Sequence, residues 1–161
     1  MNVLRQGIEI RDLKIHIKEN PQTSSQEIKL SGIDMIFLPY AGSFKDIIIK
    51  GSIDDELLGN YSFTMKLFAD GPRLDIEACA NNVMMNEEFC GRFPYIGKML
   101  WEDYKPVGRV NASCNARFDN KDKQKKMDYV IRVNLHGLKV MHKYLPEPIY
   151  DLNGELELNP A

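Results

Sequence analysis

Histidines, cysteines and neighbouring acids are the residues of this 161-residue chain whose chemistry could support catalysis or metal binding. His136 and His142 are separated by five residues, and no further ligand stands near either at the spacing that a zinc or iron site requires. The adjacent acids Asp54 and Asp55 are typical of a solvated turn and do not indicate a glycosidase pair. We therefore predict surface or partly buried histidines and no metal site.

The three cysteines, Cys79, Cys90 and Cys114, are odd in number and widely spaced, so they form neither a zinc knuckle nor a redox pair. We predict buried free thiols, with one disulfide as the alternative in an oxidising compartment. The chain also lacks the GxSxG, P-loop and GxGxxG motifs that would supply a nucleophile or bind a nucleotide. The sequence therefore predicts a protein that is not an enzyme and binds no cofactor.

Composition places the chain among folded globular proteins. Charged residues make up 27% and hydrophobic residues 43%, and the length suits a single β-rich domain over residues 1–161. The formal net charge of -2 gives no reason to expect nucleic acid as a partner. The first ten residues lack the features of a signal peptide, which leaves two expectations: a cytosolic protein, or a piece of a longer one.

The segments that must position any site are short strands, because apolar residues recur at every second position between glycines and prolines. The alternation changes phase at Arg11 and Asp12, which predicts a bulge. We select the following residues as the lining of an apolar groove or as core: Tyr61, Phe63, Met65, Leu67, Val110, Ala112, Phe118, Tyr129, Ile131, Val133 and Leu135.

The spacing becomes helical between residues 86 and 104, and this segment separates two groups of strands. Asn86 is the predicted N-cap, and four apolar residues follow at intervals of three and four: Phe89, Phe93, Ile96 and Leu100. Because Pro94 interrupts this pattern, we expect one or two short helices. The predicted fold is mainly β: an antiparallel, strongly twisted sheet, either an open groove or sandwich-like, with helices around residues 86–104.

Two stretches carry a family resemblance, "FPYIGKMLWEDYKPVGRVNASCNARF" and "RVNLHGLKVMHKYLPEPIYDLNGELELN". Each has a proline corner followed by an alternating strand. Together they resemble the strand repeats of AsmA-like bacterial envelope proteins over most of residues 83–161. The matching residues are Pro106, Gly108, Pro146, Pro148, Leu152, Asn153 and Gly154.

The resemblance implies a long β-groove whose concave apolar face handles lipid, in intermembrane transport or outer-membrane biogenesis. The implied ligands are phospholipids or fatty acyl chains, and the implied location is the periplasm or cell envelope. It also implies a fragment of a longer chain, whose neighbouring segments join the sheet by strand addition. The residues alone leave a second interpretation open, a β-sandwich scaffold or protein-interaction module without a lipid ligand, and a cytoplasmic location as the alternative.

Overall fold

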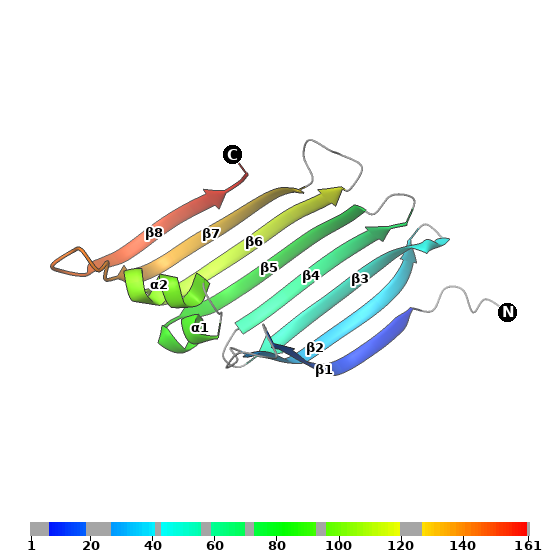
Figure 1. Ribbon diagram of the computed structural model, residues 1–161, viewed down its shortest axis with the longest axis horizontal. Helices are drawn as coiled ribbons and strands as arrows, with labels where there is room; N and C mark the ends of the chain where they lie inside the picture. The colour runs from blue at the N-terminus through cyan, green and yellow to red at the C-terminus, as the bar shows by residue number, and fades with distance from the viewer. Residues whose placement is uncertain are drawn as a thin grey trace.

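The computed structural model describes residues 7–18, 27–40, 43–55, 59–69, 73–92, 96–119 and 127–160 of the chain. They form one eight-stranded antiparallel sheet, in which each strand pairs with its neighbours in sequence order (Figure 1). The elements are β1 (Ile8–Lys18), β2 (Glu27–Tyr40), β3 (Ser43–Asp55), β4 (Gly59–Phe68), β5 (Arg73–Met85), α1 (Glu87–Gly91), α2 (Ile96–Tyr104), β6 (Val107–Asp119), β7 (Met127–Val140) and β8 (Ile149–Leu158).

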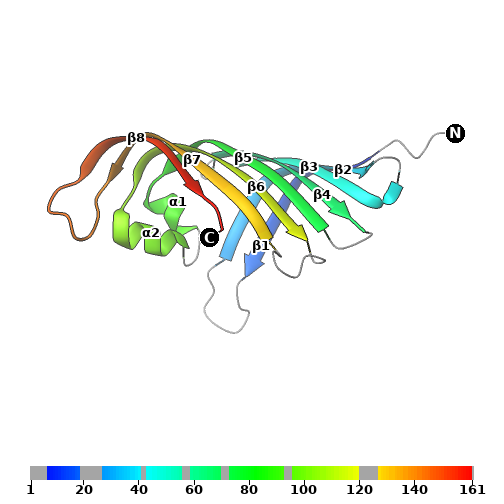
Figure 2. The same cartoon turned by 90° about the horizontal axis from the view of Figure 1, so that it is seen from above.

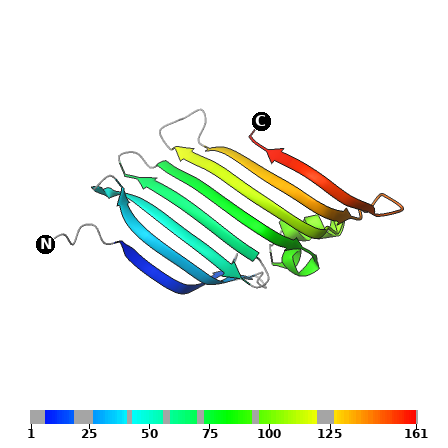
Figure 3. The same ribbon diagram turned by 180° about the vertical axis from the view of Figure 1, so that it is seen from behind.

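The sheet is curved, and both helices lie on its concave side. Figure 2 shows the strands as an arch with α1 and α2 beneath it, and Figure 3 shows the other face, with the strands in front of the helices. Strand twist and bulges both favour such curvature. The predicted fold class is confirmed, and of its two arrangements the open one is observed: the described residues form no second sheet.

The helical segment is divided in two, as its proline indicated. The side chain of Asn86 accepts a hydrogen bond of 2.8 Å from the backbone N–H of Phe89, so the predicted N-cap is confirmed. Pro94 and Phe93 lie outside the described residues, in the gap between the two helices. The predicted proline corners also stand directly before strands, since Pro106 precedes β6 and Pro148 precedes β8.

Bulges keep the apolar residues of a strand on one side of the sheet. Asp12 has a φ of 49°, and the β1–β2 register shifts between Ile10 and Leu13, so the predicted bulge is confirmed. Because of the extra residue, Ile10 and Leu13 both pair with apolar residues of β2, although three positions separate them. Asn82 on β5 and Gly137 on β7 also have positive φ values and lie at register shifts.

At each of these three bulges, an Asp or Asn of the next strand accepts a hydrogen bond from the backbone N–H of the positive-φ residue. This bond satisfies an amide that the disrupted ladder would otherwise leave free. The three bonds run from Asp12 to Asp34 (2.9 Å), from Asn82 to Asn111 (2.7 Å) and from Gly137 to Asn153 (2.8 Å).

Several of the best-buried side chains lie at the bulges. Val83 and Leu138 directly follow a positive-φ residue, and they form a buried cluster with Val110 and Ala80. Of the three free thiols, only Cys90 is buried as predicted. The prediction of burial was wrong for Cys79, which is exposed because it lies on the convex side. Cys114 is half-buried.

Candidate functional site: an apolar face open at one end

One side of the sheet is apolar from β1 to β8. Directly paired residues of antiparallel strands point to the same side, so the register assigns each side chain to a face. One row of paired residues runs through Tyr61, Ala80, Ala112, Val133 and Leu156. Phe89 of α1 packs against the cluster that includes Ala80, so this is the concave side that bears the helices.

The residues selected from the sequence all lie on this side. Tyr61, Phe63, Met65 and Leu67 are on β4, Val110, Ala112 and Phe118 on β6, and Tyr129, Ile131, Val133 and Leu135 on β7. We call this side the apolar face, and it also carries Ile10, Leu13, Ile33, Met35, Phe37, Ile49, Ile53, Leu74, Ile76, Val83, Leu138, Leu152, Leu156 and Leu158.

Helices cover one end of the apolar face, which we call the covered end. Its central residues are Val83, Val110 and Leu138, which are 2%, 7% and 7% exposed. The end of α2 is bound to the turn after β7 by two hydrogen bonds between Lys143 and Asp103. The backbone N–H of Lys143 donates to the carbonyl of Asp103 at 2.9 Å, and the Nζ of Lys143 donates to the carboxylate of Asp103 at 2.7 Å. The covered end is therefore a small closed core.

The opposite end of the same face, the open end, has no such cover among the described residues. Its row of paired residues includes Leu67, Phe118 and Met127, which are 39%, 42% and 55% exposed. Along β6, Phe118 lies eight positions after Val110, which corresponds to about 26 Å of strand. The apolar face thus runs from a closed core to a large exposed patch of a kind that usually marks an interaction site.

Polar chemistry on the apolar face is sparse. Burial, with a smaller contribution from Asp55, raises the pKa of Tyr61 above its usual 10.0, which favours the neutral phenol. Asp55 itself is buried, accepts a 3.2 Å hydrogen bond from Ser31 and lies 3.7 Å from the guanidinium of Arg92, which follows α1. This pair ties the end of α1 to β3.

His136 and His142 have separate surroundings and do not meet at one site. His136 contacts the side-chain amide of Asn111 at 3.1 Å, whereas the ring of His142 packs between the rings of Tyr104 and Tyr144. Within the described parts of the chain, no group of three or more His, Cys, Asp or Glu side chains is arranged to hold a metal ion.

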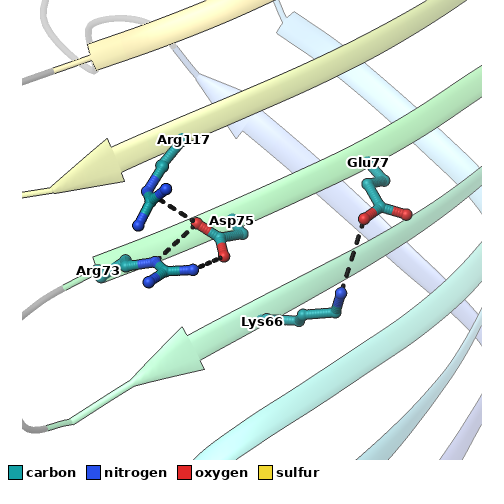
Figure 4. Close-up of polar contacts among 5 residues, drawn as sticks. All are labelled: Lys66, Arg73, Asp75, Glu77 and Arg117. Atoms are coloured by element: carbon teal, nitrogen blue, oxygen red, sulfur yellow. Dashed lines mark hydrogen bonds and ion pairs between the residues drawn. The ribbon is translucent and has the colours of Figure 1, made fainter.

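The convex side is polar over β4 to β8. Asp75 accepts a 3.0 Å hydrogen bond from Arg73 and lies 3.7 Å from Arg117, and Lys66 and Glu77 pair at 3.6 Å beside them (Figure 4). A shallow depression of about 320 Å³ is lined by three neighbouring residues from each of β5, β6 and β7, and these include Asp75, Glu77 and Arg117. The charge pairs of the convex side contrast with the apolar face.

Sequence reasoning missed several of the best-buried residues of the apolar face, notably Ile33, Val83 and Leu138. Each follows a residue with positive φ, and the bulge there breaks the two-residue alternation on which the selection depended. The signal that could have found them is a Gly or Asn inside a strand, followed directly by an apolar residue.

No known protein family, curated protein or solved structure matches this chain. Among the helices of the described residues, none combines the length and the apolar character needed to cross a membrane. Any function must therefore be inferred from the apolar face itself.

Proposed function

We propose that the chain is a non-catalytic, lipid-handling segment of an AsmA-like envelope protein, and that the open end of its apolar face holds acyl chains. The observation that carries the proposal is the exposure of Leu67, Phe118 and Met127 on the concave side of the arch. A concave surface can surround a chain-like ligand more fully than a flat one. The family resemblance, read from the residues, supports the same function.

The energetics of acyl binding suit this surface. Each buried methylene contributes about 0.8 kcal/mol, so a 16-carbon chain would gain roughly 12 kcal/mol, enough to offset much of its removal from a bilayer. The open end offers aliphatic and aromatic side chains and few groups that would have to give up water. Acyl chains therefore fit this end better than polar ligands do.

The covered end has a different role in this proposal. Phe89 and the residues around Val83 close the sheet there, so an acyl chain lying along the strands would stop against the helices. A lipid would then have its tail toward α1 and its headgroup toward the open end, where Arg73 and Arg117 lie on the adjoining convex side. Lipids with one long chain should fill the face as well as phospholipids do.

The test is binding of acyl ligands by the purified chain. Organic extracts are analysed by mass spectrometry, and a fluorescent fatty acid is titrated and then displaced with phospholipid. We expect a bound acyl species and saturable displacement. A chain that is free of lipid after purification and ignores the fluorescent probe would contradict the proposal and favour the sandwich or interaction-module interpretation.

Substitutions on the two sides of the sheet locate the binding surface. Phe118→Asp and Met127→Asp place charges on the open end, and each should weaken probe binding at least about tenfold. Ser62→Asp is the matched control, because Ser62 is exposed on the convex side of β4. Equal effects of all three changes would show that the probe does not bind the apolar face.

A further inference from the structure

The first and last strand pairs of the sheet contain the same double bulge. In each pair the register shifts twice around a central apolar pair, Leu13 with Ile33 or Leu138 with Leu152. The corresponding paired residues are Ile10–Met35, Leu13–Ile33 and Ile15–Leu30 in the first case, and Leu135–Gly154, Leu138–Leu152 and Val140–Ile149 in the second. By this register, β1 is the structural equivalent of β7.

Strand β7 pairs with β8 on one side and with β6 on the other, and β6 shows what a strand needs in order to pair with the bulge of β7. β6 runs past the bulge with Gly108, whose φ is 146°. A Cβ atom at Gly108 would lie 3.0 Å from the Cα of Leu138. A strand that pairs with this bulge therefore needs a glycine in this conformation opposite the central leucine.

The same glycine conformation recurs on β8 without a visible reason. Gly154 has a φ of 144°, close to that of Gly108, yet a Cβ atom built on it would meet nothing within 4 Å. β8 is an edge strand, and so is β1 with its own bulge at Asp12 and Leu13. Thus one edge carries a bulge, and the other carries the glycine that fits such a bulge.

We propose that β8 of one copy of this chain pairs with β1 of a second copy, with Gly154 opposite the bulge at Leu13. With eight antiparallel strands, β1 and β8 run in opposite directions, so a copy shifted along the sheet presents β1 antiparallel to β8 (Figure 1). Backbone hydrogen bonds between the two edges would then continue the sheet across the joint.

The side chains in this register are complementary. We let β8 pair with β1 of the second copy as β6 pairs with β7, with Gly154 in the place of Gly108. This register places Leu156 opposite Ile10 and Leu158 opposite Ile8. These leucines are 54% and 57% exposed, and Ile8 is 68% exposed, so the joint would extend the apolar face from one copy to the next.

Charge also favours this register. It places Glu155 opposite Arg11, a favourable cross-strand pair. It also places Glu157 directly opposite Glu9, an unfavourable pair that is offset because each already has an arginine partner at 2.9 Å, Arg132 and Arg11 respectively. Two β8 edges meeting each other would instead bring Glu155 and Glu157 of both copies together, which disfavours a symmetric dimer.

The contact is head-to-tail, so every added copy leaves one free β8 and one free β1. Such contacts give closed rings or open filaments. The association does not depend on lipid, so its failure and the failure of the proposed function are distinguishable.

The test is sedimentation of the purified chain at concentrations from micromolar to several hundred micromolar. We expect oligomers that grow with concentration. Arg11→Glu or Glu155→Arg alone should weaken association about tenfold, because each puts like charges opposite one another. The double variant, and an equimolar mixture of the two single variants, should both recover it, since each restores an opposite-charge pair. Lys98→Glu on α2 is the matched control away from both edges.

Circular dichroism verifies that each variant is folded. We expect folding to be unaffected, because the side chains of Arg11 and Glu155 are both exposed. A chain that stays monomeric over the whole range would overturn the proposal. Association that neither inversion weakens, or that the double variant and the mixture fail to restore, would overturn it equally.

Discussion

The two ends of the apolar face are built from the same kinds of residue but differ in how far they are covered. At the covered end, Val83 and Val110 are nearly inaccessible beneath the helices, whereas at the open end Phe118 and Met127 keep about half of their surface exposed. Both ends lie on the same strands, so strand composition does not cause the difference. The helices between β5 and β6 divide one continuous face into a buried core and an exposed apolar surface.

The largest expected effect comes from placing a charge at each end. Val83→Asp buries an unpaired carboxylate and should cost about 3 to 5 kcal/mol of unfolding free energy. Met127→Asp, on an exposed position, should cost less than about 1 kcal/mol. Urea unfolding followed by circular dichroism measures both, and similar costs would show that the open end is as closed as the covered one.

A smaller effect is expected at two glycines with the same backbone conformation. Gly108→Ala adds a methyl group beside the Leu138 backbone in a strained conformation and should cost about 2 to 4 kcal/mol. Gly154→Ala has the strain without the contact, so about 1 to 2 kcal/mol is expected when the protein is dilute enough to be monomeric. Urea midpoints give the difference, and Gly154→Ala costing as much as Gly108→Ala would contradict this account.

The strands, the bulge at Asp12 and the break between the helices could be predicted because each has a local cause. Alternation of apolar and polar residues indicates a half-buried strand, and a change in the phase of that alternation indicates an extra residue. A proline interrupts a helix. The residues chosen for the apolar face came from the same alternation, which is why all of them lie on one side.

The split of that face into two ends could not be predicted in the same way. Tyr61 and Leu67 belong to one alternating run, yet only Tyr61 packs against the covered core. Their difference depends on where the helices fold back, and this is a contact between segments far apart in sequence. Alternation also does not distinguish an open sheet from a sandwich, since both place the apolar residues of each strand on one side.

The fastening of α2 should have a moderate effect. Asp103→Asn weakens the charged part of the contact with Lys143, whose pKa is raised chiefly by the hydrogen bond to Asp103. The backbone bonds remain and the pair is solvent-exposed, so we expect only a small loss of stability, with faster amide exchange in α2 and little change at the open end. Glu102→Gln is the control, because its pair with Lys98 is exposed, at 63% and 66% of the two side chains. Unchanged exchange in α2 would show that the side-chain contact does not hold the helix.

The smallest effect expected is a pH dependence specific to the open end, which has charge pairs on its convex side and no helical cover. The hydrogen bond from Arg73, together with the charges of Arg73 and Arg117, holds the pKa of Asp75 below its usual 3.8. The folded state therefore binds this proton less readily than the unfolded chain, so the stabilisation is complete above about pH 4 and is lost as the pH falls through the folded-state value.

Because the pair is partly solvated, the loss should be only about 0.5 kcal/mol, and amide exchange near Arg73 should rise at pH 3 before that near Val83. Asp75→Asn should remove this part of the acid dependence, whereas Glu77→Gln, on the more exposed neighbour, should leave it in place. Exchange that rises first beneath the helices would mean that the covered end, despite its buried core, is the weaker half of the sheet.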